Sequence, residues 1–263
     1  DEGMLKDAVG SATLTGTEVT LGPAGIKKLD AAATLNGREI TVSKLDLIRD
    51  EATVDLPRPG KITLPANQGD PVAFDLTLDS PETNLDLVRA CRPCGPRRGK
   101  GGLTVRLTGD MKAPNITASL EGQNLAINMG GDREFPLSRV SFIANARRDA
   151  SGNGVIEVDS GRVEHTVYDP QDRTKILRED AVSFDAAVPL QTVKTPKGTE
   201  IIRVASDGNL KVKFGVEKLG LDTLSEAFGG KVRASGTLTG EVSAGRTLRQ
   251  PALGRQLALY ASE

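Results

Sequence analysis

The stretch VAFDLTLDS, from Val72 to Ser80, decides the fold. Apolar side chains recur at every second position of this stretch, and small or polar residues fill the positions between them. A period of two is typical of a β-strand with one dry face and one wet face. One-sided strands indicate an antiparallel or mixed sheet, because the strands of a parallel sheet are buried on both faces. The apolar set is Val72, Phe74, Leu76 and Leu78.

The same alternation recurs in three other stretches, GLTVRLTGDM at 102–111, LKVKFGVEK at 210–218 and VRASGTLTGEVSA at 232–244. Weaker versions, separated by turn signals rich in Gly, Pro and Asn, bring the expected number of strands to about 14 to 16. The apolar positions of the three stretches include Val105, Leu107, Val212, Phe214, Leu238 and Val242.

Two short helices are expected beside the strands. SPETNLDLVRAC, at 80–91, offers Ser80 as a cap and Pro81 at the first helical position. LDTLSEAFGG, at 221–230, spaces its apolar residues for a helix and ends in a glycine pair that suits a C-cap.

The composition limits both the core and the partners. The chain has 263 residues, with 34 basic and 35 acidic side chains and a net charge of -1. This balance gives no overall attraction to nucleic acid or to an anionic membrane. With 6 Phe, 2 Tyr and no Trp, a core filled by large rings is hard to build. We therefore expect an all-β chain with a thin, extended core. Its one-sided strands must cover their dry face, by pairing into a sandwich, by closing into a barrel or by curling around an apolar guest.

One sequence unit occurs twice, from Gly102 to Ile127 and from Gly236 to Tyr260. Each copy has an alternating strand, a turn containing glycine (Gly109 or Gly245) and a proline that opens the next strand. Proline lacks the N–H that a sheet ladder needs, so it belongs at the start of a strand. The prolines are Pro114 and Pro251, and the matching apolar residues after them are Ile116 and Leu120 in the first copy and Leu253 and Leu257 in the second.

The second copy, together with the strand and helix before it, resembles the AsmA-like / TamB family of bacterial envelope proteins. The shared cadence is a strand, a short helix, a glycine-spaced strand, a turn and a strand opened by proline. The residues in that cadence are Gly230, Gly236, Gly240, Pro251, Leu253, Gly254, Leu257 and Leu259. The resemblance covers about a fifth of the chain well. The copy at 102–127 follows the cadence more loosely, with Ala118 where the family often has glycine.

The resemblance implies an elongated, curled antiparallel or mixed sheet (a taco or half-pipe) with an apolar groove and one or two short helices. The alternating apolar residues named above would line this groove and contact lipid: Val72, Phe74, Leu76, Leu78, Val105, Leu107, Ile116, Leu120, Val212, Phe214, Leu238, Val242, Leu253 and Leu257. The resemblance also implies a non-enzymatic segment without a cofactor that moves phospholipid between the inner and outer membranes and supports outer-membrane biogenesis. Its partners would be phospholipid acyl chains and an outer-membrane β-barrel protein, with no nucleic acid. It also implies a periplasmic location, as part of an inner-membrane-anchored protein that contacts the membrane through segments outside this chain. We expect residues 1–263 to form a single elongated segment, with a sub-boundary near 89–102.

The alternative function is a scaffold or chaperone that pairs its edge strand with outer-membrane protein strands. A third reading, an enzyme or passenger domain on a right-handed β-helix, is disfavoured because regular short rungs and a one-sided carboxylate or histidine site are missing.

The only two cysteines, Cys91 and Cys94, lie in the stretch CRPCGPRRGKGG. A structural zinc site needs four ligands, and these two cysteines and the single histidine are too few. A redox C-x-x-C opens a helix after a strand, whereas Cys91 ends an expected helix here. A local disulfide is the favoured state in an oxidising compartment, and a reduced pair is the alternative.

The other candidate sites have ordinary explanations. The basic residues of the cysteine stretch could meet lipid phosphates, but a solvated loop between strands is favoured, and no phosphate-loop motif is present. His165, on the same side of its strand as Val163, is expected to be a structural residue with its hydrogen bonds satisfied. No carboxylate pattern suits a metal. The basic residues are Arg89, Arg92, Arg97, Arg98 and Lys100.

Overall fold

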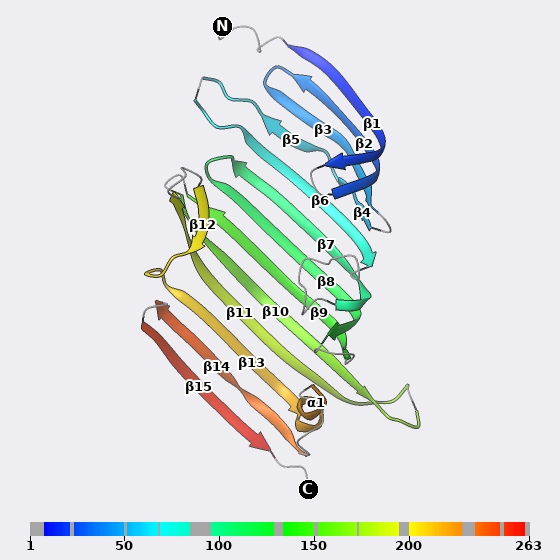
Figure 1. The fold of residues 1–263 in the computed structure, drawn as a ribbon, viewed down its shortest axis with the longest axis vertical. Helices are drawn as coiled ribbons and strands as arrows, with labels where there is room; N and C mark the ends of the chain where they lie inside the picture. The colour runs from blue at the N-terminus through cyan, green and yellow to red at the C-terminus, as the bar shows by residue number, and fades with distance from the viewer. Residues whose placement is uncertain are drawn as a thin grey trace. The chain divides into compact units, whose positions relative to one another are not determined.

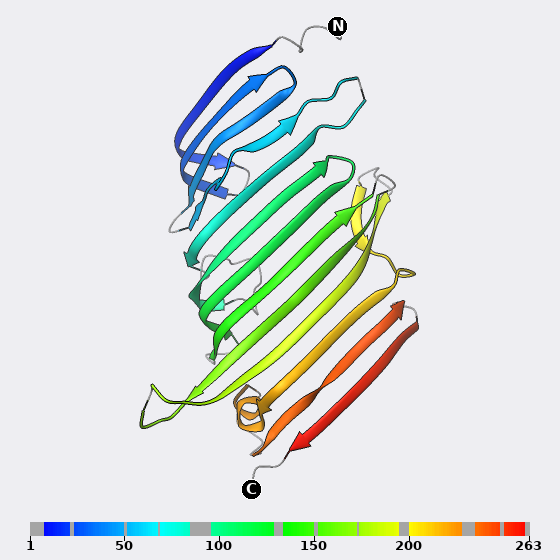
Figure 2. The same ribbon diagram turned by 180° about the vertical axis from the view of Figure 1, so that it is seen from behind.

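The strands that the structure describes form a single open sheet. The computed structural model describes residues 8–21, 24–49, 52–67, 69–84, 96–128, 134–149, 152–172, 174–194, 200–227, 235–247 and 250–260. Its 15 strands follow the order β1-β2-β3-β5-β6-β7-β8-β9-β10-β11-β13-β14-β15, with β4 beside β3 and β12 beside β11 (Figures 1 and 2). The all-β antiparallel fold is confirmed. The prediction of a single segment over 1–263 stays a prediction.

The strands and the helix have the following bounds: β1 (Val9–Leu21), β2 (Ala24–Asn36), β3 (Glu39–Arg49), β4 (Ala52–Val54), β5 (Gly60–Thr63), β6 (Ala73–Asn84), β7 (Pro96–Asp110), β8 (Pro114–Asn128), β9 (Glu134–Arg148), β10 (Asn153–Tyr168), β11 (Ile176–Lys194), β12 (Glu200–Val204), β13 (Leu210–Gly220), α1 (Leu221–Ala227), β14 (Thr237–Thr247) and β15 (Gln250–Tyr260). Helix α1 confirms the helix predicted from LDTLSEAFGG.

The chain divides into two compact units. Unit 1 comprises Asp1–Thr83, Gly102–Ser119 and Asn145–Gly154, and unit 2 comprises Asn84–Gly101, Leu120–Ala144 and Val155–Glu263. Each unit contains neighbouring strands of the sheet.

In unit 1 the register keeps apolar residues together on one face. Leu35 pairs with Ile40, Ile40 with Ile62, and Ile62 with Phe74. Residues directly opposite each other in a sheet share a face, so four neighbouring strands contribute to one apolar surface. An irregularity between Ala32 and Ala33 gives β3 one extra residue. This extra residue keeps the apolar positions of β3 on one face although their spacing changes.

In unit 2 the same principle operates in β11, β13, β14 and β15. Phe184 pairs with Phe214, and Phe214 pairs with Val242. The register slips by one residue between Val216 and Leu219, where Lys218 has a φ of 50°. This β-bulge returns Leu219 to the face that carries Phe214, opposite Leu238.

Very little of the described apolar surface is buried. The described apolar residues that are buried are Ile26, Leu125, Ala126, Leu137 and Ala181. In unit 2, Leu125 and Leu137 pack with the half-buried Val140 and Val163. The expectation of a thin core is therefore met within the described residues.

Two local predictions are wrong. Ser80 and Pro81 do not start a helix but lie in β6. Asp79 exchanges both backbone hydrogen bonds with Asp55, N to O distances 2.9 and 2.8 Å, and this pairing holds the segment extended. Gly245 lies inside β14, opposite Ala252, rather than in a turn. Residues 85–95 lie outside the described residues.

The basic stretch after the cysteines is also a strand rather than a loop, because β7 begins at Pro96 and contains Arg97, Arg98 and Lys100. One of its glycines, Gly99, allows the β7 backbone to approach Leu125 closely. Gly99 has a φ of 125°, and a Cβ there would lie 2.5 Å from Leu125 Cδ2 and 2.9 Å from Leu125 Cα. Leu125 is thus buried against a backbone that has no side chain in its way.

Candidate functional site

The unit 1 apolar face is the surface on which the predicted lining residues of unit 1 lie. All its members are half-buried. Polar contacts show which residues of β6 and β7 lie on the opposite face. Arg106 lies 3.5 Å from Asp75, and the Thr104 hydroxyl donates to Asp79 at 2.7 Å. Because side chains alternate along a strand, the residues between these must point the other way. The unit 1 apolar face comprises Leu35, Ile40, Ile62, Val72, Phe74, Leu76, Leu78, Val105, Leu107 and Ile116.

Ion pairs cover the opposite face of unit 1. Asp30 contacts Lys28 at 2.8 Å and Lys44 at 3.6 Å, and Lys44 also reaches Asp46 at 3.2 Å. The hydrogen bond from Lys28 lowers the pKa of Asp30, and the hydrogen bond to Asp46 raises the pKa of Lys44. Both lysines are exposed and only Asp30 is largely covered, at 14% side-chain exposure, so solvent screens the pairs and they contribute little to stability.

The unit 2 apolar face is the corresponding surface of the second unit. Four of the strands that carry it, β11, β13, β14 and β15, lie side by side in both ribbon views (Figures 1 and 2). By register, Ala244 pairs with Leu253 and Gly240 with Leu257, so β15 adds two leucines to this side of the sheet, with Arg255 between them opposite Val242. Leu120 follows Ile116 in phase on β8. The unit 2 apolar face comprises Leu120, Phe184, Val212, Phe214, Val216, Leu219, Leu238 and Val242, with Leu253 and Leu257 placed by register alone.

Nothing among the described residues of unit 2 covers the centre of this face. Phe214 is 47% exposed and Val242 is 37% exposed. The rings of Phe184 and Phe214 are tilted by 33° with centroids 6.4 Å apart. Gly161 lies against Phe184, where a Cβ would come within 2.5 Å of the ring. The result is a flat apolar patch, made by two rings and bordered by glycine and aliphatic side chains, that water can reach.

Sequence reasoning missed two members of the unit 2 apolar face. Phe184 belongs to the alternating run Val182, Phe184 and Ala186, in which the alternation is weaker than in the neighbouring strands. Leu219 follows the bulge at Lys218, so a count of period two from Val216 places Leu219 on the wrong face.

A buried ionic cluster lies at one end of the unit 2 apolar face. Asp180 is 1% exposed. It accepts hydrogen bonds from Arg178 Nε at 2.5 Å, from the Thr223 hydroxyl at 2.5 Å and from the Gly220 N–H at 3.2 Å. Arg178 also donates to Asp222 at 2.8 Å. We call Arg178, Asp180, Asp222 and Thr223 the latch.

The latch sets the charges of its members. Burial lowers the pKa of Arg178, but hydrogen bonds to Asp180 and Asp222 outweigh it and leave this pKa raised. Burial raises the pKa of Asp222, but the Thr223 backbone and Arg178 outweigh it and leave this pKa lowered. Both groups are therefore charged at neutral pH. The cluster is a structural ion pair, because every strong donor and acceptor in it already has a partner.

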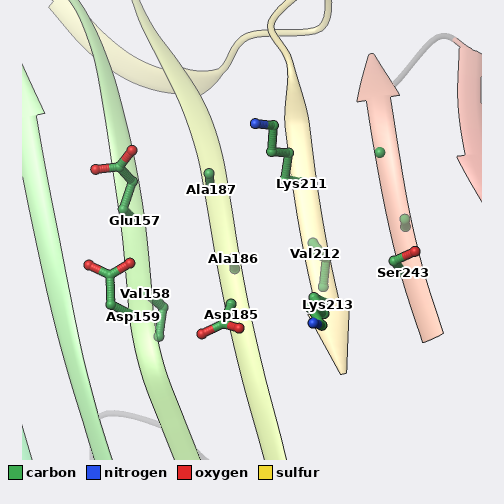
Figure 3. Close-up of a pocket in the computed structure, with 12 residues that line it drawn as sticks. Glu157, Val158, Asp159, Asp185, Ala186, Ala187, Lys211, Val212, Lys213 and Ser243 are labelled. Carbon is green, nitrogen blue, oxygen red and sulfur yellow. The ribbon is translucent and has the colours of Figure 1, made fainter. Parts of the chain in front are cut away.

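The wet side of unit 2 carries a shallow depression of about 500 Å³ between β10, β11, β13 and β14. Figure 3 shows Glu157, Asp159 and Asp185 on two of these strands, with Lys211 and Lys213 beside them. Lys213 also pairs with Glu241 at 2.8 Å, and this hydrogen bond raises the pKa of Lys213. The depression is a charged surface open to solvent.

The remaining candidate residues add no catalytic geometry. Cys91 and Cys94, with Arg89 and Arg92, lie outside the described residues. His165 is half-buried in β10 and interacts with a neighbour. Among the residues that the structure describes, no three His, Cys, Asp or Glu side chains come together in a way that could hold a metal ion.

Comparisons with family models, with curated proteins and with solved structures find no match for this chain. The family resemblance of the repeat therefore stays a prediction. In the described part of the chain, no helix has the length and hydropathy needed to cross a bilayer.

Proposed function

We propose that the chain is a non-enzymatic lipid-transfer segment whose apolar faces hold phospholipid acyl chains. The observation that carries the proposal is the exposure of the unit 2 apolar face, where Phe214 and Val242 stay open to solvent although both belong to an apolar row. Contiguous exposed apolar patches of this kind mark surfaces that bind an apolar partner.

The chemistry of the faces suits an acyl chain better than a compact ligand. The lining is mostly aliphatic, with few rings, and the described polar contacts lie on the other side of each unit except for the latch at one end of the unit 2 apolar face. Burying a methylene gains about 0.8 kcal/mol, so a chain of about a dozen buried methylenes gains on the order of 10 kcal/mol before ordering is subtracted. Binding of this type needs no oriented catalytic group.

The cellular role belongs to the same proposal. The repeat, with its strand, short helix and strand opened by proline, supports an AsmA-like role in moving phospholipid between the inner and outer membranes. In that role the chain would be the periplasmic part of an inner-membrane-anchored protein.

The test is lipid analysis of the purified protein. Mass spectrometry of material purified without detergent should find phospholipid in the wild-type protein and much less in a Phe214→Arg variant. A wild-type protein that carries no lipid, and binds none from vesicles, would contradict the proposal.

A second candidate function has one observation in its favour. Among the described strands, β1 and β15 each have a single neighbour in the sheet. Such edges can accept a strand from another protein, as a scaffold for outer-membrane β-barrel proteins would require. Recovery of trapped client strands instead of lipid would favour this role.

A further inference from the structure

Helix α1 lies over the unit 2 apolar face. Ala181 of β11 pairs with Glu217, on the wet side. Its neighbour Asp180 therefore points to the apolar side. The Thr223 hydroxyl of α1 and the Gly220 N–H just before it both donate to Asp180. The first turn of α1 is thus held above the apolar side of β11, at the end of β13 (Figure 1).

The contact that holds α1 is ionic although the surface beneath it is apolar. Thr223 is 4% exposed and Asp180 is 1% exposed, so the centre of the latch is dry. Well-packed apolar residues hold such contacts at least as well as a buried ion pair. A buried hydrogen-bonded network differs from an apolar contact because its bonds form and break together. Removing one partner leaves the other buried polar groups uncompensated. The latch therefore gives α1 two distinct positions, attached or released.

The geometry also allows α1 to detach without disturbing the neighbouring strands. Helix α1 has seven residues, fewer than an isolated helix needs for stability in water, so its attachment depends on the latch. The outermost member, Asp222, has a side chain that is 60% exposed. Its bond to Arg178 can break without disturbing the pairing of β11 with β13.

We propose that α1 is a gate at one end of the unit 2 apolar face, closed by the latch and opened when Asp222 and Thr223 separate from Arg178 and Asp180. Opening frees the apolar side of β11 and β13 for the end of an acyl chain to enter or leave. This inference rests on the proposed function and adds the place of entry to it.

The first test measures opening without lipid. Hydrogen–deuterium exchange followed by mass spectrometry should show the amides of α1 exchanging faster than those of β13 in the wild-type protein. Asp222→Ala should speed exchange in α1 about tenfold, the effect of losing one charge-assisted hydrogen bond, and leave β13 unchanged. The matched control is Glu241→Ala, which removes an exposed ion pair on the wet side and should change neither. If α1 exchanges only at the rate of β13 in both proteins, it opens only by unfolding, and the gate is wrong.

The second test measures passage. Release of NBD-palmitate, followed by fluorescence, should be about tenfold faster from Asp222→Ala than from the wild-type protein, and unchanged in Glu241→Ala. Tight binding with unchanged release in Asp222→Ala would overturn the gate and leave the apolar face as the lipid site. If the wild-type protein binds no NBD-palmitate, the proposed function fails, and the gate as a passage for lipid fails with it.

Discussion

The aromatic rings of Phe184 and Phe214 lie 6.4 Å apart on neighbouring strands, and Phe214 remains 47% exposed. Two rings in contact inside a core would normally be covered on all sides. Here one side of the pair stays open, so the pair forms a surface. The substitutions that test this surface are those that change its polarity without changing the sheet.

Phe214→Arg should leave the fold intact and abolish lipid binding. The new guanidinium can reach water from a position that is already half open, so it escapes the large penalty of a buried unpaired charge. Circular dichroism should be near normal, while NBD-palmitate binding falls to background. Leu107→Arg makes the same test in unit 1.

The control for these variants lies one residue away on the wet side. Arg106→Glu and Lys213→Glu each change the charge by two units, twice the change in Phe214→Arg, but should retain binding. If Phe214→Arg unfolds the domain, the face is a closed core. If the variant retains full binding, lipid lies elsewhere.

Asp180→Ala should be the most destabilising change in the latch. It leaves Arg178 without its main buried partner and removes the acceptor for Thr223 and Gly220. Breaking a buried pair in this way costs about 3 kcal/mol. Urea unfolding should show the loss, and Glu241→Ala should show no measurable change. A loss no larger than that of Glu241→Ala would mean that the cluster does not hold the fold.

Gly99→Ala should destabilise unit 2 by about 2 kcal/mol. The φ of 125° is unfavourable for alanine, and the added methyl would meet both the side chain and the backbone of Leu125. Gly10→Ala is a matched control within a strand, because a Cβ at Gly10 has no neighbour within 4 Å. Thermal unfolding of the two variants gives the comparison, and equal midpoints would show that Leu125 can move away freely.

Acid should release α1 before it unfolds the sheet. Because the pKa of Asp222 is lowered in the folded protein, its contribution to stability is full above the unfolded aspartate value of about 3.9. The contribution is lost as the pH falls through the lower, folded value. The opening equilibrium of α1, obtained from hydrogen exchange rates divided by the intrinsic amide rate at each pH, should therefore rise below about pH 4, and Asp222→Asn should remove that dependence. The same acid profile in Asp222→Asn would assign the effect to another group.

Much of the fold can be predicted from the sequence because alternation is a local property. The runs at Val72–Ser80 and 210–216 have the period of a one-sided strand, and the structure pairs both in an antiparallel sheet. Pro114 opens β8 as expected for a residue without an N–H. The short helix at 221–227 was also foreseeable from its glycine stop and apolar spacing.

The failures arise where distant residues decide local structure. Ser80 and Pro81 carry a helix-start pattern, but the backbone exchange between Asp79 and Asp55 overrides it. The glycines from 99 to 102 suggest a loop, but they lie in β7, where Gly99 leaves room for Leu125 of the neighbouring strand. The latch could not be foreseen, because Asp180 and Thr223 are 43 residues apart and meet only through the register of β11 and β13.

The bulge at Lys218 has a consequence for how such chains can change over evolution. A one-residue insertion in a regular strand turns every later side chain to the wrong side. At Lys218 the extra residue is absorbed in a single left-handed φ of 50°, and Leu219 regains its place. Asn124 in β8 and Ser160 in β10 have similar positive φ values, 51° and 54°. A strand with such a bulge can gain a residue and still keep its apolar and polar faces. Related chains can therefore accumulate changes in strand length and in the spacing of apolar residues until sequence alignment no longer detects their relationship.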